Sequence, residues 1–185
     1  VTCHSRLADA EQVTREIRAL GRRAFVGAGD HADPALVDQL FREVRAAFGR
    51  LDIFVANAGV WPVGDVPLVD MSPEQWRATL RANLDGVYYT TRAALGLLRP
   101  GGRLILVSST AGQRGEAGHA DYAATKGGVI ALTKSLAIEC APDLTVNCVA
   151  PGWVDTEMTA SVLTGEARER AIAGIPLRRI ATAED

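Results

Sequence analysis

The sequence lacks the features that mark membrane proteins, nucleic-acid-binding proteins and secreted proteins. No apolar run approaches the roughly 18 residues that a membrane span requires. The formal net charge is −2, so no excess of basic residues indicates a nucleic-acid partner. The opening stretch VTCHSRLADA has neither the charged start nor the apolar segment of a secretory leader. We therefore expect no membrane and no nucleic acid among the partners.

Cysteine is scarce as well. The chain has Cys3, Cys140 and Cys148, an odd and scattered set without metal-ligand spacing. Such residues suit small core positions better than a disulfide framework. We expect no metal site, and a reducing cytoplasm as the compartment.

What is present is typical of a globular domain. Apolar residues make up 48% and charged residues 23% of the 185 residues, enough for one domain with a sizeable core. No repeat, linker or low-complexity segment divides the chain. We therefore predict a single domain over residues 1–185.

Short apolar runs alternate with amphipathic stretches along this domain. Strands are predicted at the opening VTCH and at residues 22–29, 51–59, 102–109 and 144–152. Helices are predicted at residues 9–20, 33–49, 72–98 and 120–141, with Asp33 and Ser72 as N-caps. This alternation predicts an α/β fold, a doubly wound parallel sheet of Rossmann type with helices on both faces in three layers.

The glycine-rich phosphate loop of dinucleotide folds is missing. That loop, G-x-G-x-x-G, usually follows the first strand. The GAG at residues 27–29 is no substitute, because no helix follows it directly. The opening VTCH is typical of the end of a strand, and the closing residues 175–185 stop where a further helix would begin. We expect an incomplete domain, without its first strand and glycine-rich loop and without its last strand and helix.

Small and polar residues follow every predicted strand. They are CHSR (3–6), Asp30, NAG (57–59), SSTAG (108–112) and PGWVDT (151–156). Because the carboxyl ends of parallel strands meet at one edge of a sheet, we expect these residues to form a ligand site there.

Five motifs occur along the chain in a characteristic order: ANAG, NLDGVYY, ILVSSTAG, YAATK and VNCVAPGWVDT. Ser109 precedes Tyr122 by thirteen positions, and Lys126 follows Tyr122 by four. On these motifs the chain resembles the short-chain dehydrogenase/reductase family over essentially its whole length. The residues around the site are similar to those of bacterial 3-oxoacyl-acyl-carrier-protein reductases and of related sugar and alcohol dehydrogenases.

The candidate catalytic residues suit carbonyl reduction, which requires a hydride on carbon and a proton on oxygen. Tyr122 is the candidate acid, and the charge of Lys126 is expected to lower its phenol pKa from about 10. Ser109 can share the substrate oxygen with the phenol, and the family's spacing favours it over Ser108. The resemblance implies that Asn83 distorts its helix and takes part in a proton relay.

The resemblance also implies a nicotinamide cofactor. Asp30 resembles the carboxylate that binds the adenine amino group, and the loop after residue 150 resembles the one that holds the carboxamide. The expected cofactor contacts are Ser5, Arg6, Asp30, Asn57, Ala58, Gly59, Tyr122, Lys126, Pro151, Gly152, Val154 and Thr156. CHSR contains no acidic residue to bind a ribose 2′-hydroxyl, whereas Arg6 suits a 2′-phosphate, so NADP(H) is favoured and NAD(H) is possible.

Several nearby residues have more than one interpretation. Trp153 is the better candidate for lining the substrate pocket, and for Trp61 core or interface packing is an equal alternative. We expect His119 to be a loop residue at the mouth of the pocket rather than a catalyst. Residues 165–174 suit a solvated helix face, and the resemblance implies a mobile lid there.

The expected activity is interconversion of a ketone and a secondary alcohol, with a 3-oxoacyl thioester as leading substrate and a sugar or other secondary alcohol as alternative. The resemblance implies a homodimer or homotetramer, formed through the helices that carry Asn83 and Tyr122. An alternative of another class is a non-catalytic chain that binds a partner.

Overall fold

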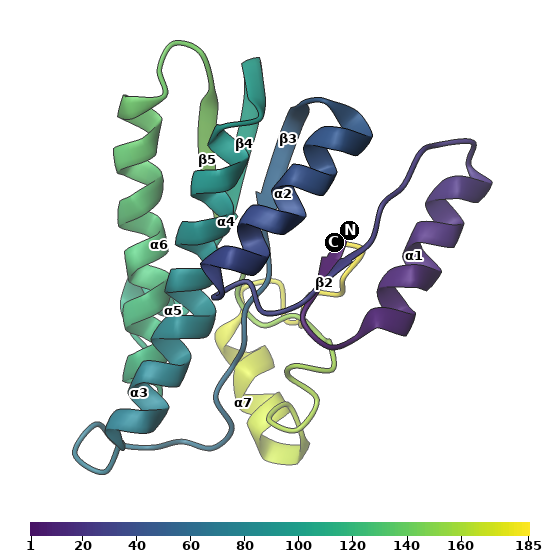
Figure 1. The fold of residues 1–185 in the computed structure, drawn as a ribbon. Helices are drawn as coiled ribbons and strands as arrows, with labels where there is room; N and C mark the ends of the chain where they lie inside the picture. The colour runs from purple at the N-terminus through teal and green to yellow at the C-terminus, as the bar shows by residue number, and fades with distance from the viewer.

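Parallel strands alternate with helices in the computed structural model, which describes all of residues 1–185 (Figure 1). The elements in chain order are β1 (Thr2–Cys3), α1 (Leu7–Ala19), β2 (Gly27–Ala28), α2 (Pro34–Phe48), β3 (Leu51–Ala56), α3 (Pro73–Leu80), the π-helix η1 (Arg81–Asp85), α4 (Gly86–Leu95), β4 (Leu98–Val107), α5 (Thr110–Arg114), α6 (Ala120–Glu139), β5 (Thr145–Val149) and α7 (Gly165–Gly174). The predicted alternation of strand and helix is confirmed.

The strands form two parallel groups. In the larger sheet, of order β3-β4-β5, Ala56 lies opposite Leu106 and Leu106 lies opposite Cys148. In the smaller pair, Thr2 lies opposite Gly27. Three of the predicted strands are confirmed in the larger sheet. The strand predicted at residues 22–29 is wrong in extent, because only its last part pairs with β1.

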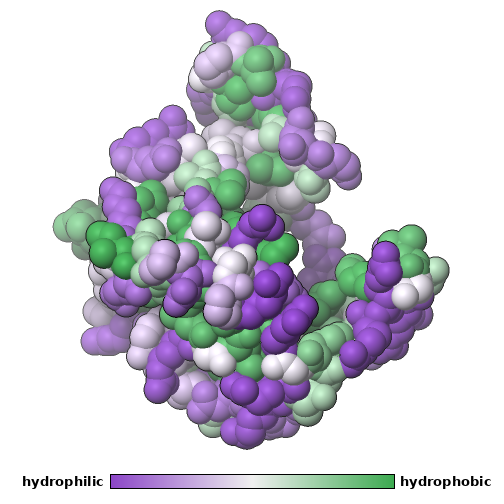
Figure 2. All heavy atoms as spheres, turned by 90° about the horizontal axis from the view of Figure 1, so that it is seen from above, coloured by the Kyte–Doolittle hydropathy of each residue, from purple (hydrophilic) through white to green (hydrophobic).

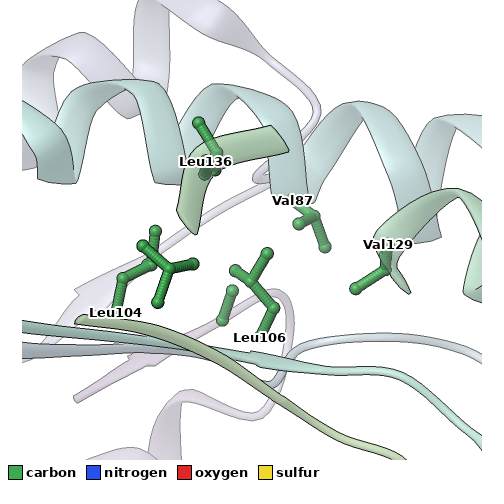
Figure 3. Close-up of a cluster of buried hydrophobic side chains, with 7 residues drawn as sticks. Val87, Leu104, Leu106, Val129 and Leu136 are labelled. Atoms are coloured by element: carbon green, nitrogen blue, oxygen red, sulfur yellow. The ribbon is translucent and has the colours of Figure 1, made fainter. Parts of the chain in front are cut away.

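Helices α4 and α6 lie side by side against one face of the larger sheet (Figure 1). The core between these helices and the sheet contains seven buried apolar residues (Figure 3): Ala56, Val87, Leu104, Leu106, Val129, Leu136 and Val146. Burying a Val or Leu side chain contributes about 1.5–3 kcal/mol, so this cluster anchors the sheet and both helices.

The other face of the larger sheet is more open. Ile53 is 51% exposed and Val55 is 49% exposed on β3. Since side chains alternate along a strand, these residues point away from the face that contains Phe54 and Ala56. A continuous apolar run such as residues 51–59 is typical of a strand buried on both faces, but in this structure β3 is covered only on the face of Phe54 and Ala56.

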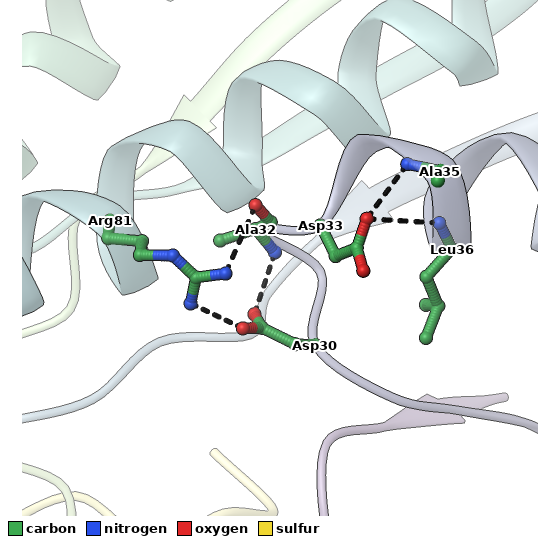
Figure 4. Close-up of polar contacts among 6 residues, drawn as sticks. All are labelled: Asp30, Ala32, Asp33, Ala35, Leu36 and Arg81. Carbon is green, nitrogen blue, oxygen red and sulfur yellow. Dashed lines mark hydrogen bonds and ion pairs between the residues drawn. The ribbon is translucent and has the colours of Figure 1, made fainter.

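The two predicted N-caps are confirmed. Asp33 accepts hydrogen bonds from the backbone N–H groups of Ala35 at 2.9 Å and Leu36 at 3.4 Å (Figure 4). Ser72 accepts one from the N–H of Gln75 at 3.1 Å. These bonds satisfy donors that the first helical turn leaves unpaired.

The long helix predicted at residues 72–98 is interrupted. Residues Arg81–Asp85 form a turn of π-helix between α3 and α4. The helix also ends earlier than predicted, at Leu95, because Leu98 already pairs with Leu51 in the sheet. The wider π turn contains Asn83, which is fully buried.

The surface contains both hydrophilic and hydrophobic residues. Seen from above, hydrophilic and hydrophobic residues are interspersed (Figure 2). None of the helices combines the length and the apolar character that crossing a bilayer requires.

Candidate active site

A cleft of about 800 Å³ opens at the carboxyl ends of β3, β4 and β5. Its walls come from the loops that follow these strands, from α5 and from the first turns of α6, together with Arg6 after β1. The prediction that small and polar residues converge at this edge is confirmed for the three strands of the larger sheet. The arrangement follows from parallel topology, which places all strand ends on one side.

Tyr122 and Lys126 lie one turn apart on α6, and both line the cleft. Lys126 Nζ donates a hydrogen bond to the carbonyl of Val107 at 3.0 Å and lies 5.6 Å from the centroid of the Tyr122 ring. Burial raises the pKa of Tyr122, and the neighbouring Ser109 hydroxyl opposes this effect. Burial also lowers the pKa of Lys126, and the electrostatic influence of Cys148 opposes this effect.

These directions correct one expectation. The charge of Lys126 was expected to lower the pKa of the phenol. In this structure burial raises the pKa of Tyr122 above its ordinary value, and the contact that opposes this effect is the hydroxyl of Ser109 rather than Lys126.

The two adjacent serines have different surroundings. Ser108 is buried, and its hydroxyl donates to the backbone carbonyl of Lys126 at 2.7 Å. Ser109 lines the cleft beside Tyr122, and its Oγ accepts a hydrogen bond from the N–H of Ala111 at 3.2 Å. Ser108 thus ties β4 to α6, and the hydroxyl that faces the reacting space beside the phenol is that of Ser109.

Asn83 supports the loop after β3. Its Oδ1 accepts a hydrogen bond from the N–H of Val60 at 2.7 Å, and its Nδ2 donates to the carbonyl of Val60 at 2.9 Å. A Cβ atom on the adjacent Gly59 would lie 3.1 Å from Asn83 Oδ1 and 3.3 Å from Lys126 Nζ. Glycine therefore lets the backbone run between two catalytic candidates. A relay role for Asn83 stays a prediction.

The predicted cofactor contacts fall into two groups. Those that line the cleft are Arg6, Asn57, Ala58, Gly59, Tyr122, Lys126, Pro151, Gly152, Val154 and Thr156. Ser5 and Asp30 lie outside its lining. The narrow backbone passage at Gly59 and the size of the cleft fit a nicotinamide cofactor together with a small substrate.

Asp30 is occupied by contacts within the protein. Its carboxylate accepts a hydrogen bond from the N–H of Ala32 at 2.8 Å and pairs with Arg81 (Figure 4). Burial opposes ionisation, but these two contacts hold the pKa of Asp30 below its ordinary value. Since Arg81 begins the π turn that holds Asn83, the pair links the loop after β2 to that turn.

Arg6 is paired as well. Its guanidinium contacts Asp9 at 2.5 Å and also pairs with Glu157 from the segment after β5. A 2′-phosphate that binds Arg6 must therefore compete with two carboxylates.

An aromatic cluster around Tyr122 was not foreseen as a unit. The ring centroid of Trp61 lies 4.0 Å from that of His119, 4.7 Å from that of Tyr122 and 5.9 Å from that of Trp153. Both tryptophans line the cleft. His119 is only 2% exposed, so the expectation of a residue at the mouth of the pocket is wrong. The position of Trp61 shortly after a predicted strand end indicated that it could line the cleft. The cluster itself was not predictable from the sequence pattern, because the rings that contact Trp61 come from distant segments.

The parallel sheet, with Ser109, Tyr122 and Lys126 at its carboxyl edge, defines the class of a Rossmann-type α/β oxidoreductase. The family model for Enoyl-(Acyl carrier protein) reductase matches residues 1–185. The chain belongs to the short-chain dehydrogenase/reductase family. The resemblance inferred from the motifs is confirmed.

Relatives of known identity include the 3-oxoacyl-[acyl-carrier-protein] reductases of Synechocystis sp., 38% identical over 179 residues, and of Staphylococcus aureus, 40% identical over 173 residues. The alignments cover 95% and 92% of this chain, and 70% and 69% of those proteins. The corresponding Escherichia coli enzyme is 37% identical, with 83% of this chain and 63% of that protein covered.

Solved structures agree with this assignment. A short-chain dehydrogenase from Burkholderia cenocepacia in complex with NADP superposes with a TM-score of 0.91 at 35% identity, covering 100% of this chain and 74% of that one. A glucose/ribitol dehydrogenase-type member from Brucella melitensis superposes with a TM-score of 0.85 at 30% identity, covering 94% of this chain and 71% of that one.

Proposed function

We propose that this chain interconverts a ketone and a secondary alcohol with NADP(H), in the manner of a 3-oxoacyl-acyl-carrier-protein reductase. The observation that supports this most is the placement of Tyr122, Ser109 and Lys126 around one cleft at the sheet edge. The bound nicotinamide would exchange a hydride with the carbonyl carbon. The protein's own groups manage the oxygen and its proton.

The Tyr122 hydroxyl donates its proton to the substrate oxygen, and Ser109 donates a second hydrogen bond to the same atom. Since its pKa lies above the ordinary value of 10.0, Tyr122 is protonated at neutral pH, the form that ketone reduction requires. In its charged form, Lys126 stabilises the phenolate that remains after proton transfer. Its hydrogen bond to Val107 holds it beside the ring.

The preference for NADP(H) rests on Arg6, the cation that lines the cleft after β1. The NADP complex of the Burkholderia relative supports the same choice. NAD(H) is the alternative, and its use would leave the ion pairs of Arg6 in place.

A 3-oxoacyl thioester is the proposed substrate, because three of the compared relatives are 3-oxoacyl-carrier-protein reductases. A sugar is the second candidate and is supported by the Brucella relative. A non-catalytic role as a partner-binding chain is a third candidate, and the intact Ser–Tyr–Lys set argues against it.

Assembly into homodimers or homotetramers through the helices that carry Asn83 and Tyr122 stays a prediction. Two large side chains are exposed there, Ile138 on α6 and Tyr88 on α4, which follows the π turn of Asn83.

The test is a substrate panel on the full-length protein. It follows NADPH and NADH absorbance with an acetoacetyl thioester, a simple ketone and glucose. We expect thioester reduction with NADPH, and a loss of about a thousandfold in Tyr122→Phe, within the range of general acid catalysis. Undiminished turnover by Tyr122→Phe, or no turnover of any ketone by the parent protein, would contradict the proposal.

A further inference from the structure

The cleft has a continuous aromatic wall, defined here as Trp61, Trp153 and the ring of Tyr122. Trp61 meets Tyr122 edge to face at 4.7 Å and 68°, and it meets Trp153 at 5.9 Å and 62°. All three residues line the cleft. The phenol that donates the proton is therefore part of the same wall, and a substituent on the reacting carbonyl that extends toward Trp61 would meet aromatic rings.

Trp61 is held in place from both sides along the chain. On one side, the two hydrogen bonds from Asn83 fix the backbone of Val60. On the other, His119 stacks on the indole at 4.0 Å and 28°, and its Nε2 lies 3.3 Å from the carbonyl of Pro62. His119 is almost completely buried, so the indole rests on a rigid support.

The two supporting loops are also joined to each other. The N–H of Val66 donates to the carbonyl of Gly118 at 2.9 Å, and the Asp65 carboxylate lies 3.6 Å from His119 Nδ1. A side chain that is already ordered loses little freedom when a ligand binds to it. The wall is thus pre-organised for a rigid ligand.

The indole N–H of Trp61 is buried and has no hydrogen-bond partner. Since this N–H is covered, the part of Trp61 that lines the cleft is apolar ring surface rather than a polar donor. Rings that meet at centroid distances of about 4.5–7 Å, edge to face or offset, gain more than their buried area alone provides. A flexible alkyl chain gains no such ring–ring stabilisation, and it loses rotamer freedom when it binds.

We propose that Trp61 is a specificity-determining residue, selecting ketones that have an aromatic ring on the carbonyl carbon over unbranched alkyl ketones of equal size. This inference rests on the proposed function and names the substrate class of the same site. The reaction is unchanged. The carbonyl carbon gains a hydride, its oxygen gains the Tyr122 proton, and the reduced nicotinamide is oxidised.

The experiment compares two thioesters of N-acetylcysteamine with the same number of carbon atoms, benzoylacetyl and 3-oxononanoyl. Each is reduced by the full-length protein with NADPH, and kcat/KM is measured for the parent, Trp61→Phe and Trp61→Leu. We expect the parent to prefer the benzoylacetyl compound. The preference is the ratio of kcat/KM for the benzoylacetyl compound to that for the 3-oxononanoyl compound. We expect this ratio to fall about tenfold in Trp61→Leu, mostly through KM. In Trp61→Phe, which keeps a flat ring, it should stay within about threefold of the parent value.

Equal preferences in Trp61→Phe and Trp61→Leu would show that apolar volume alone matters and would overturn the proposal. A parent that prefers the alkyl compound would overturn it as well. Thermal melts by circular dichroism check the fold of each variant, and Trp61→Met replaces Trp61→Leu if that variant does not fold.

A binding measurement separates this inference from the proposed function. Saturation-transfer NMR follows the phenyl protons of the benzoylacetyl compound with the parent and both variants, without turnover. Strong saturation in the parent and Trp61→Phe, lost in Trp61→Leu, supports the wall even if no ketone is reduced. Equal saturation in all three proteins overturns it, whatever the reduction assay shows.

Discussion

The two ends of the cleft are built in different ways. At the catalytic end, Tyr122 and Lys126 project from α6, which packs on the buried core through Val129 and Leu136. At the end formed by β1 and β2, the strands have two residues each. There α1 stands apart from the other helices (Figure 1), and Leu20, the residue that follows its last turn, is 77% exposed.

The difference shows which forces position each group. Tyr122 and Lys126 are both buried against the packed helix, and Lys126 also donates a hydrogen bond to the backbone carbonyl of Val107, so solvent screens their contacts little. The residues predicted to recognise the adenosine part of the cofactor, Arg6 and Asp30, are held by exposed or half-exposed ion pairs, which salt and solvent weaken. Substitutions at the first end should damage rate and stability, and substitutions at the second should adjust cofactor affinity.

The largest expected effect is on the chemical step. Lys126→Met removes the cation beside Tyr122, and we expect kcat for ketone reduction to fall about a hundredfold or more. Single-turnover absorbance measurements on the full-length protein check this. Lys126→Arg is the matched control, which keeps the charge and should retain more activity. Equal losses in both variants would contradict a role for charge.

The pH dependence should differ between the two directions. Because burial raises the pKa of Tyr122 above 10.0, the phenol stays protonated through neutral pH. Ketone reduction should therefore be nearly flat near neutrality, and alcohol oxidation, which needs the phenolate, should increase toward alkaline pH. Rate profiles in both directions check this, and an oxidation optimum at neutral pH would be the contrary result.

The two faces of the larger sheet should respond unequally to truncation. Leu106→Ala leaves a cavity beneath α4 and α6, and we expect a loss of about 2–5 kcal/mol in the free energy of unfolding. Ile53→Ala on the open face should cost clearly less, because its side chain is half exposed. Urea unfolding of both variants makes the comparison. Equal losses would mean that the open face is covered in solution.

Cofactor affinity should change when the pairs of Arg6 are altered. Arg6→Ala should raise KM for NADPH about tenfold and leave KM for NADH nearly unchanged, as expected for loss of one charge-assisted contact. Glu157→Gln should have the opposite and smaller effect, because it removes a competitor for Arg6. Steady-state kinetics with both cofactors test this. An equal change for NADH would argue against 2′-phosphate recognition.

The smallest expected effect is on the link between the β2 loop and the π turn. Asp30→Asn breaks the pair with Arg81 and should raise KM for either cofactor by a few fold. The folded-state pKa of Asp30 is lowered, so its contribution to stability is present above the ordinary value of 3.8 and is lost as pH falls through the folded value. Acid melts of parent and variant should therefore converge at low pH.

The sequence predicts those features of the fold that depend on neighbouring residues better than those that depend on contacts between distant segments. The N-caps Asp33 and Ser72 and the strands after them follow from neighbouring residues, and the structure confirms them. The extent of β2 and the end of the helix at Leu95 depend on pairing with distant segments, and there the prediction is wrong. The same holds for His119, whose burial comes from stacking on Trp61.

The sequence by itself determined the α/β class and the Ser109, Tyr122 and Lys126 spacing, because residue periodicity and helical pitch are local properties of the chain. Only the tertiary structure decided that the pKa of Tyr122 is raised, that Ser108 is committed to the backbone of Lys126, and that an aromatic wall surrounds the phenol. The physical reason is that desolvation and ring packing depend on what surrounds a side chain in space, and those neighbours come from segments far apart along the chain.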